Sequence, residues 1–177
     1  MNNTRLTQVV FVLILALLGA ASRLVDHVPN FAPITALALV SGYYLRGRWS
    51  WTVAIGAMLI SDAFIGFYSL PIMASVYGSF MLSWALARYA PTLMGLAWRT
   101  LASSVLYFLV TNAAVWAFTG MYSKTLGGLL QSYFMAIPFF RASFASDLLF
   151  TGAFVAAMQL ALAWKARLTL EKTYAKA

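Results

Sequence analysis

The chain has few charged residues and no cysteine, and each scarcity excludes a class of protein. Aspartate, glutamate, lysine and arginine make up 9% of the 177 residues, whereas a soluble domain carries about 25%. So few charges cannot cover a surface that faces water, and we expect lipid to be the solvent for much of the chain. The absence of cysteine excludes disulfides, thiolate metal sites and cysteine nucleophiles.

Hydrophobic residues account for 63% of the sequence and fall into six runs. Short segments rich in charge, proline or glycine separate them. A helix that crosses a bilayer needs roughly 20 mostly apolar residues, so the pattern predicts one all-α integral membrane domain, a bundle of six transmembrane helices. The runs are residues 7–22, 31–45, 52–68, 70–87, 100–119 and 142–164.

The net charge of +8 comes from basic residues that lie between the apolar runs. This placement is typical of a topology signal, and it argues against a nucleic-acid-binding patch. With the N-terminus inside, only Arg23, Lys124 and Arg141 of the twelve basic residues fall outside. The bias predicts a multi-pass protein of a bacterial inner membrane with both termini in the cytoplasm.

The long outer segment between the fifth and sixth runs has apolar side chains at helical spacing. It begins near Gly127 and ends before Pro138. This pattern predicts an extra amphipathic helix over residues 127–137 that lies on the outer membrane surface. The alternative is a seventh half-span buried in the bundle.

Three strongly polar side chains share one predicted depth. Asp62, Asn112 and Asp147 each lie roughly 8–10 Å from the outer end of their run at 1.5 Å per residue. Ionisable residues inside a membrane are costly and usually mark function, so we expect the three to converge on one outward-open cavity. In the structural alternative, the carboxylates only cap backbone or pair with Arg23 and Arg141.

The outer segment between the first two runs is the most distinctive stretch. Pro29 and Pro33 stiffen its backbone, and a stiff loop can hold Asn30 above such a cavity, next to Thr35. His27 is the only histidine. We expect it to form hydrogen bonds within the loop, although neutral imidazole also suits several metals as a ligand.

Several motifs resemble those of one uncharacterised family of small bacterial six-helix membrane proteins, which are named as transport proteins. The most specific is Arg-x-x-x-His-x-Pro-Asn-Phe-x-Pro-Ile over residues 23–34. The later motifs are Ser61-Asp62 with Gly66-Phe67, Val76-Tyr77, Thr111-Asn112 with Trp116, and Ile137-Pro138-Phe139-Phe140.

This family is in turn similar to the substrate-binding components (S-components) of energy-coupling factor (ECF) vitamin transporters. The resemblance implies a six-helix subunit that captures a vitamin- or cofactor-type solute under the outer loops, with cobalamin or a related vitamin as the expected solute. The cysteine that some cobalamin members use to bind cobalt is missing here, in the segment 76–79. The residues expected at the solute are Arg23, His27, Asn30, Asp62, Tyr68, Tyr77, Asn112, Arg141 and Asp147.

The resemblance also implies a protein partner. In S-components an Ala-x-x-x-Ala motif of the first helix meets a transmembrane coupling subunit, and Ala16 and Ala20 match it. Small residues let another helix approach closely, and the same pair would also serve packing within the bundle. The sequence has no Gly-rich phosphate-binding motif of an ATPase. Energy from ATP would therefore come from coupling proteins, unless the chain works alone.

Two other classes of function stay open. A structural or assembly protein without a small ligand would have a well-packed bundle with no outward cavity. An intramembrane enzyme would use Asp62 and Asp147 as a carboxylate dyad, but neither has a Gly-x-Gly-Asp context. We expect a protein that is not an enzyme, needs no cofactor or metal, and binds a small solute within the lipid bilayer.

Overall fold

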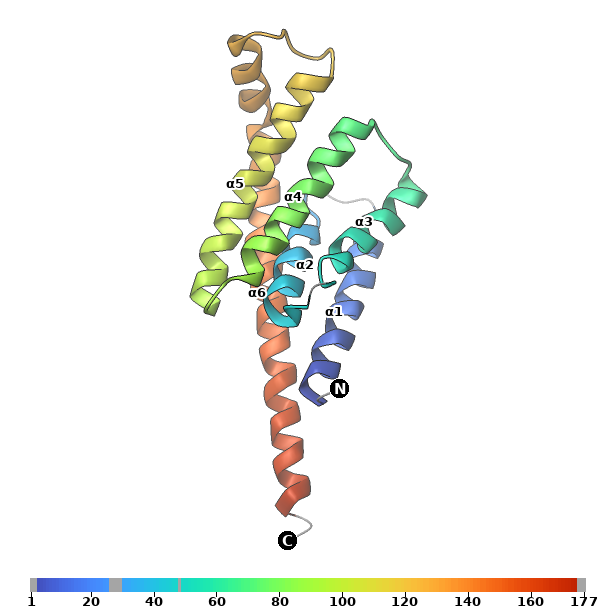
Figure 1. Ribbon diagram of the computed structural model, residues 1–177, viewed down its shortest axis with the longest axis vertical. Coiled ribbons are helices and arrows are strands. Elements are labelled where there is room, and N and C mark those ends of the chain that lie inside the picture. Colours follow the sequence, from blue (N-terminus) through green and yellow to red (C-terminus); the bar gives the residue numbers. More distant parts are fainter. Residues whose placement is uncertain (1–2, 26–29, 48, 175–177) are drawn as a thin grey trace.

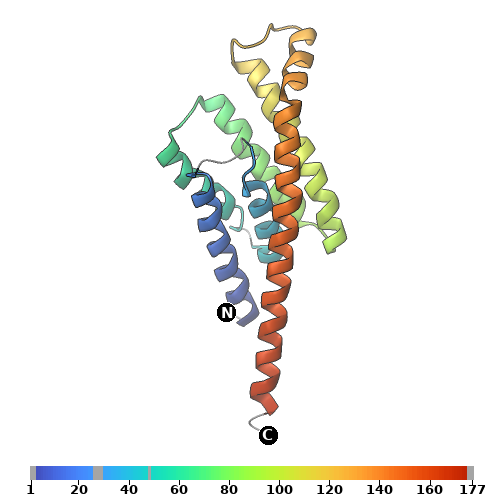
Figure 2. The same ribbon diagram turned by 180° about the vertical axis from the view of Figure 1, so that it is seen from behind.

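The computed structural model describes residues 3–25, 30–47 and 49–174, and these residues are helical apart from their connections. Successive helices run in alternating directions, so the first residues of α1 and the last residues of α6 lie at the same end of the molecule (Figures 1 and 2). The connections α3–α4 and α5–α6 lie toward the opposite end, here called the far end. The helices are α1 (Asn3–Ser22), α2 (Ile34–Val40), the π-helix η1 (Ser41–Leu45), α3 (Thr52–Ile65), α4 (Leu70–Arg88), α5 (Leu93–Phe118) and α6 (Leu126–Tyr174).

Four helices, α1, α4, α5 and α6, are long and apolar enough to cross a membrane. The remaining apolar helices, Ile34–Leu45 and Thr52–Ile65, are shorter. At 1.5 Å per residue they reach about 18–21 Å, against about 30 Å of bilayer hydrocarbon. The all-helical prediction is confirmed for the residues that the structure describes, but the second and third runs do not form helices of full spanning length.

The helix α2 lies at the centre of the structure, which explains why its sequence is hydrophobic although it is short. All seven of its residues are buried, and Leu37 and Leu39 have no exposed surface. It packs against α1, α3, α4, α5 and α6. A helix that is apolar all round is expected in such a buried position.

The close packing of η1 on α4 depends on Gly42. A Cβ atom at this position would lie 2.6 Å from the carbonyl oxygen of Trp84 and 3.3 Å from the Cβ of Ala87. A backbone oxygen cannot rotate away, so the two helices would have to separate. We expect Gly42→Ala to lower the free energy of unfolding by about 1–3 kcal/mol.

Gly56→Ala in α3 is the matched control, because a Cβ there would meet no described atom within 4 Å. It should be neutral or slightly stabilising, since alanine favours helix over glycine. Thermal unfolding in detergent compares the two variants. An equal loss of stability in both would contradict the role given to Gly42.

The helix α6 is continuous over 49 residues and contains Pro138 in its interior. The predicted separate surface helix over residues 127–137 is therefore wrong, because this segment is the first part of α6. Proline removes only one backbone N–H, and neighbouring helices can compensate for it in an apolar helix. For that reason Pro138 does not end the helix here.

Contacts with α5 direct this first part of α6 along α5 instead of along a surface. The Tyr133 hydroxyl donates a hydrogen bond to the Leu109 carbonyl (3.0 Å), and the Ser132 hydroxyl donates one to the Asn112 carbonyl (3.0 Å). The Phe108 ring lies 5.5 Å from that of Tyr133. Figure 1 shows the two helices side by side up to the far end.

Candidate functional site

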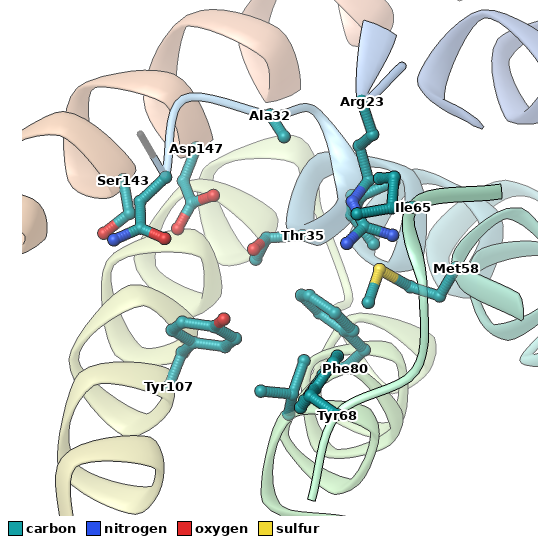
Figure 3. A pocket seen from close by; sticks show the side chains of 13 residues that line it. Arg23, Ala32, Thr35, Met58, Ile65, Tyr68, Phe80, Tyr107, Ser143 and Asp147 are labelled. Carbon is teal, nitrogen blue, oxygen red and sulfur yellow. The ribbon is translucent and has the colours of Figure 1, made fainter. Parts of the chain in front are cut away.

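A cavity of about 420 Å³ lies among the helices where α1 and α3 end and α2 begins. We call it the main cavity (Figure 3). Its apolar lining comes mainly from α2, α3 and α4: Ala32, Ile34, Met58, Ile65, Val76 and Phe80. Its polar lining comes from α2, α5, α6 and the segments that follow α1, precede α2 and join α3 to α4: Arg23, Asn30, Thr35, Tyr68, Tyr107, Ser143 and Asp147.

One side of the main cavity is formed by Arg23, which follows α1. Its guanidinium Nη1 lies 2.7 Å from Oδ1 of Asp62 in α3 and also donates to the hydroxyl of Ser61. The hydroxyl of Tyr77 in α4 donates to the other carboxylate oxygen of Asp62 at 2.7 Å. The side chain of Asp62 is 1% exposed and that of Arg23 is 18% exposed. A carboxylate this deeply buried needs such partners, so Asp62 lies behind Arg23 and holds it in place.

The opposite side of the main cavity is formed by Asp147 of α6, with Thr35 between the two sides (Figure 3). Its Oδ2 accepts a hydrogen bond from the hydroxyl of Ser104 in α5 at 2.7 Å, and its carboxylate accepts another from Thr35. The neighbouring hydroxyl of Ser146 donates to the Ala32 carbonyl at 3.1 Å. These bonds join α6 and α5 to the start of α2.

Aromatic rings form a third part of the lining. The rings of Phe80 in α4 and Tyr107 in α5 stack with centroids 5.4 Å apart. Tyr68 lies on the α3–α4 connection, where burial and then the nearby Asp62 carboxylate raise the pKa of its phenol. The Tyr68 hydroxyl therefore stays protonated at neutral pH and can donate a hydrogen bond.

A smaller cavity of about 130 Å³ adjoins the main cavity and shares Asn30, Tyr107 and Ser143 with it. We call it the side cavity. Asn112 lines it, and the Asn112 amide also donates to the carbonyl of Phe108 in its own helix at 2.8 Å. Asn30 has a φ of 61°, a left-handed conformation in which asparagine is enriched. The backbone there places Asn30 at the junction of the two cavities.

The predicted solute-binding residues separate into groups in the structure. Four of them line the main cavity: Arg23, Asn30, Tyr68 and Asp147. Asp62 and Tyr77 lie behind Arg23, and Asn112 lines the side cavity. The expectation that Asp62, Asn112 and Asp147 all line one cavity is therefore wrong for the first two, because equal depth along a helix does not determine which way a side chain points.

Two further predicted residues have no described place at the cavities. The Arg141 side chain is exposed on α6 and is absent from the described lining of both cavities. His27 lies outside the residues that the structure describes. The two carboxylates of the suggested dyad, Asp62 and Asp147, have separate partners.

The small-residue pair of α1 packs inside the bundle. Ala20 is 4% exposed and belongs to the hydrophobic core, against which Ala16 also packs. A Cβ at the adjacent Gly19 would lie 3.6 Å from Leu37 of α2. Ala16 itself is half-buried, so this placement matches the packing alternative, and docking to a coupling subunit stays a prediction.

Sequence reasoning missed Phe80, Tyr107 and Ser104 as residues of the site. Phe80 lies in an apolar run and carries no signal of its own. The other two belong to a polar stripe at helical spacing in α5, together with Ser103 and Thr111. Hydroxyl groups repeated on one face of an otherwise apolar helix could have identified this face as the one toward the cavity.

Comparison with known proteins gives a family for this chain. No curated protein and no solved structure matches it, so the likeness to S-components rests on the length of the chain, the six predicted helices and the predicted position of the termini. One family profile matches residues 3–170, which is nearly the whole chain. The chain therefore belongs to the family described as Family of unknown function (DUF6580).

Proposed function

We propose that this chain is the substrate-binding membrane component of an uptake system for a vitamin- or cofactor-type solute. The main cavity is the observation that carries the proposal. Its volume of about 420 Å³ falls within the range of about 300–1,000 Å³ that is usual for small-molecule sites. Its lining also has the usual composition of such sites, namely apolar and aromatic walls with a few polar groups.

The surface of the structure supports a place within a membrane. Large apolar side chains are widely exposed, among them Leu17 (67%), Phe64 (76%) and Leu160 (72%). Exposed apolar surface on this scale suits lipid better than water. We propose a bacterial inner membrane, with the first residues of α1 and the last residues of α6 in the cytoplasm beside most of the basic residues. The main cavity then opens toward the outside.

This placement supports a capture step at the outer face and leaves the energy source to other proteins. No nucleotide-binding motif is present in the sequence. A transmembrane coupling subunit with ATPases is therefore the proposed partner, and a solitary facilitator is the alternative. Solute uptake into vesicles that contain the purified chain alone is compared with uptake into vesicles that also contain its membrane partners. Uptake by the chain alone indicates a solitary facilitator.

Filling the main cavity tests the proposal. Ala32 lines the cavity, and Ala32→Phe keeps the backbone carbonyl that accepts from Ser146. We expect the wild-type protein to carry a co-purified small molecule that native mass spectrometry detects. The variant should carry at least about tenfold less of it, because a benzyl group occupies the space.

Ala102→Phe is the matched control, since Ala102 is exposed on α5 away from the main cavity. It should retain the small molecule at the wild-type level. A folded wild-type protein that carries no small molecule and shows no uptake would contradict the proposed function. Equal retention in both variants would show that the main cavity is not the binding site.

A further inference from the structure

The charged groups around the main cavity do not balance. Arg23 and Asp62 form an ion pair at 2.7 Å, so their charges compensate each other before any ligand arrives. Ser61 and Tyr77 complete this pair with neutral hydroxyl groups. The pair therefore offers a ligand little net charge, although Arg23 itself lines the cavity.

Asp147 is the charged group that remains. It lines the main cavity, is 3% exposed, and accepts hydrogen bonds from the neutral hydroxyls of Ser104 and Thr35. Among the side chains described in residues 5–25, 30–47 and 49–171, no lysine or arginine lies within ion-pair distance of it. A buried carboxylate without a cationic partner is costly, and a positively charged ligand would supply that partner.

The aromatic lining favours the same kind of ligand. The stacked rings of Phe80 and Tyr107 line the cavity together with Tyr68. Ring faces carry partial negative charge and attract cations, most strongly where water is excluded. A carboxylate beside aromatic rings is an arrangement that recognises an organic cation with an apolar or aromatic body.

We infer that the main cavity binds an organic cation, whose positive group pairs with Asp147 and whose ring lies against Phe80 and Tyr107. This inference rests on the proposed function, because it names the chemical class of the solute that the same cavity would take. It also assigns separate roles to the two charged sides: Asp147 binds the ligand's charge, and the Arg23–Asp62 pair shapes the wall.

Three probes of similar size and different charge test the inference: benzylamine, which is protonated at neutral pH, benzyl alcohol and benzoate. Binding to the full chain in phosphatidylcholine nanodiscs is measured by ligand-observed NMR, with empty nanodiscs as background. We expect benzylamine to bind about tenfold more tightly than either of the others, because hydrogen bonds to charged groups are the stronger ones. Asp147→Asn should remove this preference, since the amide retains an acceptor oxygen for Ser104 but carries no charge.

Glu171→Gln is the matched control, because it removes one carboxylate charge from an exposed position near the end of α6. It should leave the preference for benzylamine unchanged. Equal or tighter binding of benzyl alcohol or benzoate to the wild-type protein would overturn the inference, and so would a preference that survives in folded Asp147→Asn. If that variant does not fold, the wild-type ranking of the three probes decides alone.

The outcomes also separate this inference from the proposed function. Binding of benzyl alcohol or benzoate without a preference for benzylamine overturns the cation inference and leaves a small-molecule site in place. No binding of any probe also overturns the inference. In that case, the co-purification experiment with Ala32→Phe decides independently whether the cavity holds a solute.

Discussion

Asp62→Ala is expected to lower the free energy of unfolding by about 3–5 kcal/mol. The substitution leaves the guanidinium of Arg23 without its carboxylate and the hydroxyl of Tyr77 without its acceptor. Arg23 and Tyr77 are both half-buried. Removing one partner of a buried ion pair destabilises more than replacing the whole pair, because it leaves the other charge without compensation. Unfolding by denaturing detergent, followed by circular dichroism, measures the effect.

A double substitution separates the charge from the space that it occupies. Arg23→Met combined with Asp62→Leu replaces the pair by apolar groups of similar size. We expect it to be more stable than Asp62→Ala, because an apolar replacement of a whole buried pair is often neutral or stabilising. The single variants Arg23→Met and Asp62→Leu complete the comparison. If their losses of unfolding free energy add up to that of the double variant, the ion pair makes no specific contribution and Arg23 is held by other contacts.

Leu37→Ala in α2 is expected to lower the free energy of unfolding by about 2–5 kcal/mol. The Leu37 side chain has no exposed surface and lies against the Gly19 region of α1. Its removal leaves a void at the point where α2 meets its neighbours, and closely packed helices relax only partly around such a void. Thermal unfolding in detergent measures the loss.

Leu160→Ala provides the comparison for this second effect. Leu160 lies on α6 and is 72% exposed, so its truncation should change the free energy of unfolding by no more than about 0.5 kcal/mol. The contrast tests the central position of α2. Similar losses in the two variants would mean that α2 is not the packed centre of the structure.

These stability effects bear on the site, because the same residues position its walls. Arg23 can line the main cavity only while Asp62 and Ser61 of α3 hold it there. Thr35 reaches Asp147 from the first turn of the buried helix α2. A binding defect in any of these variants therefore has to be compared with its folded fraction before a direct role is assigned.

Composition and the spacing of apolar residues were sufficient to determine the class of the fold. A chain with 9% charged residues and long uninterrupted apolar runs is typical of helices, which satisfy their own backbone in lipid, and the structure is helical over the described residues. Four residues that the sequence singled out, Arg23, Asn30, Tyr68 and Asp147, line the main cavity, and their contact with a solute stays a prediction. Polar groups inside or beside apolar runs are costly unless they have partners, so their mere presence is informative.

Only the tertiary structure decided how the helices use their hydrophobic faces. Apolar runs that face lipid and apolar runs buried among other helices look alike in sequence, so the sequence predicts a full span where the structure has the short buried helix α2. Pro138 looked like the end of a helix, but packing against α5 keeps α6 continuous. The rotation of each helix, which no count along the chain reveals, brings Asp147 to the main cavity and turns Asp62 toward Arg23 and Tyr77. Depth along a helix follows from residue number, whereas direction around it depends on which neighbours pack there.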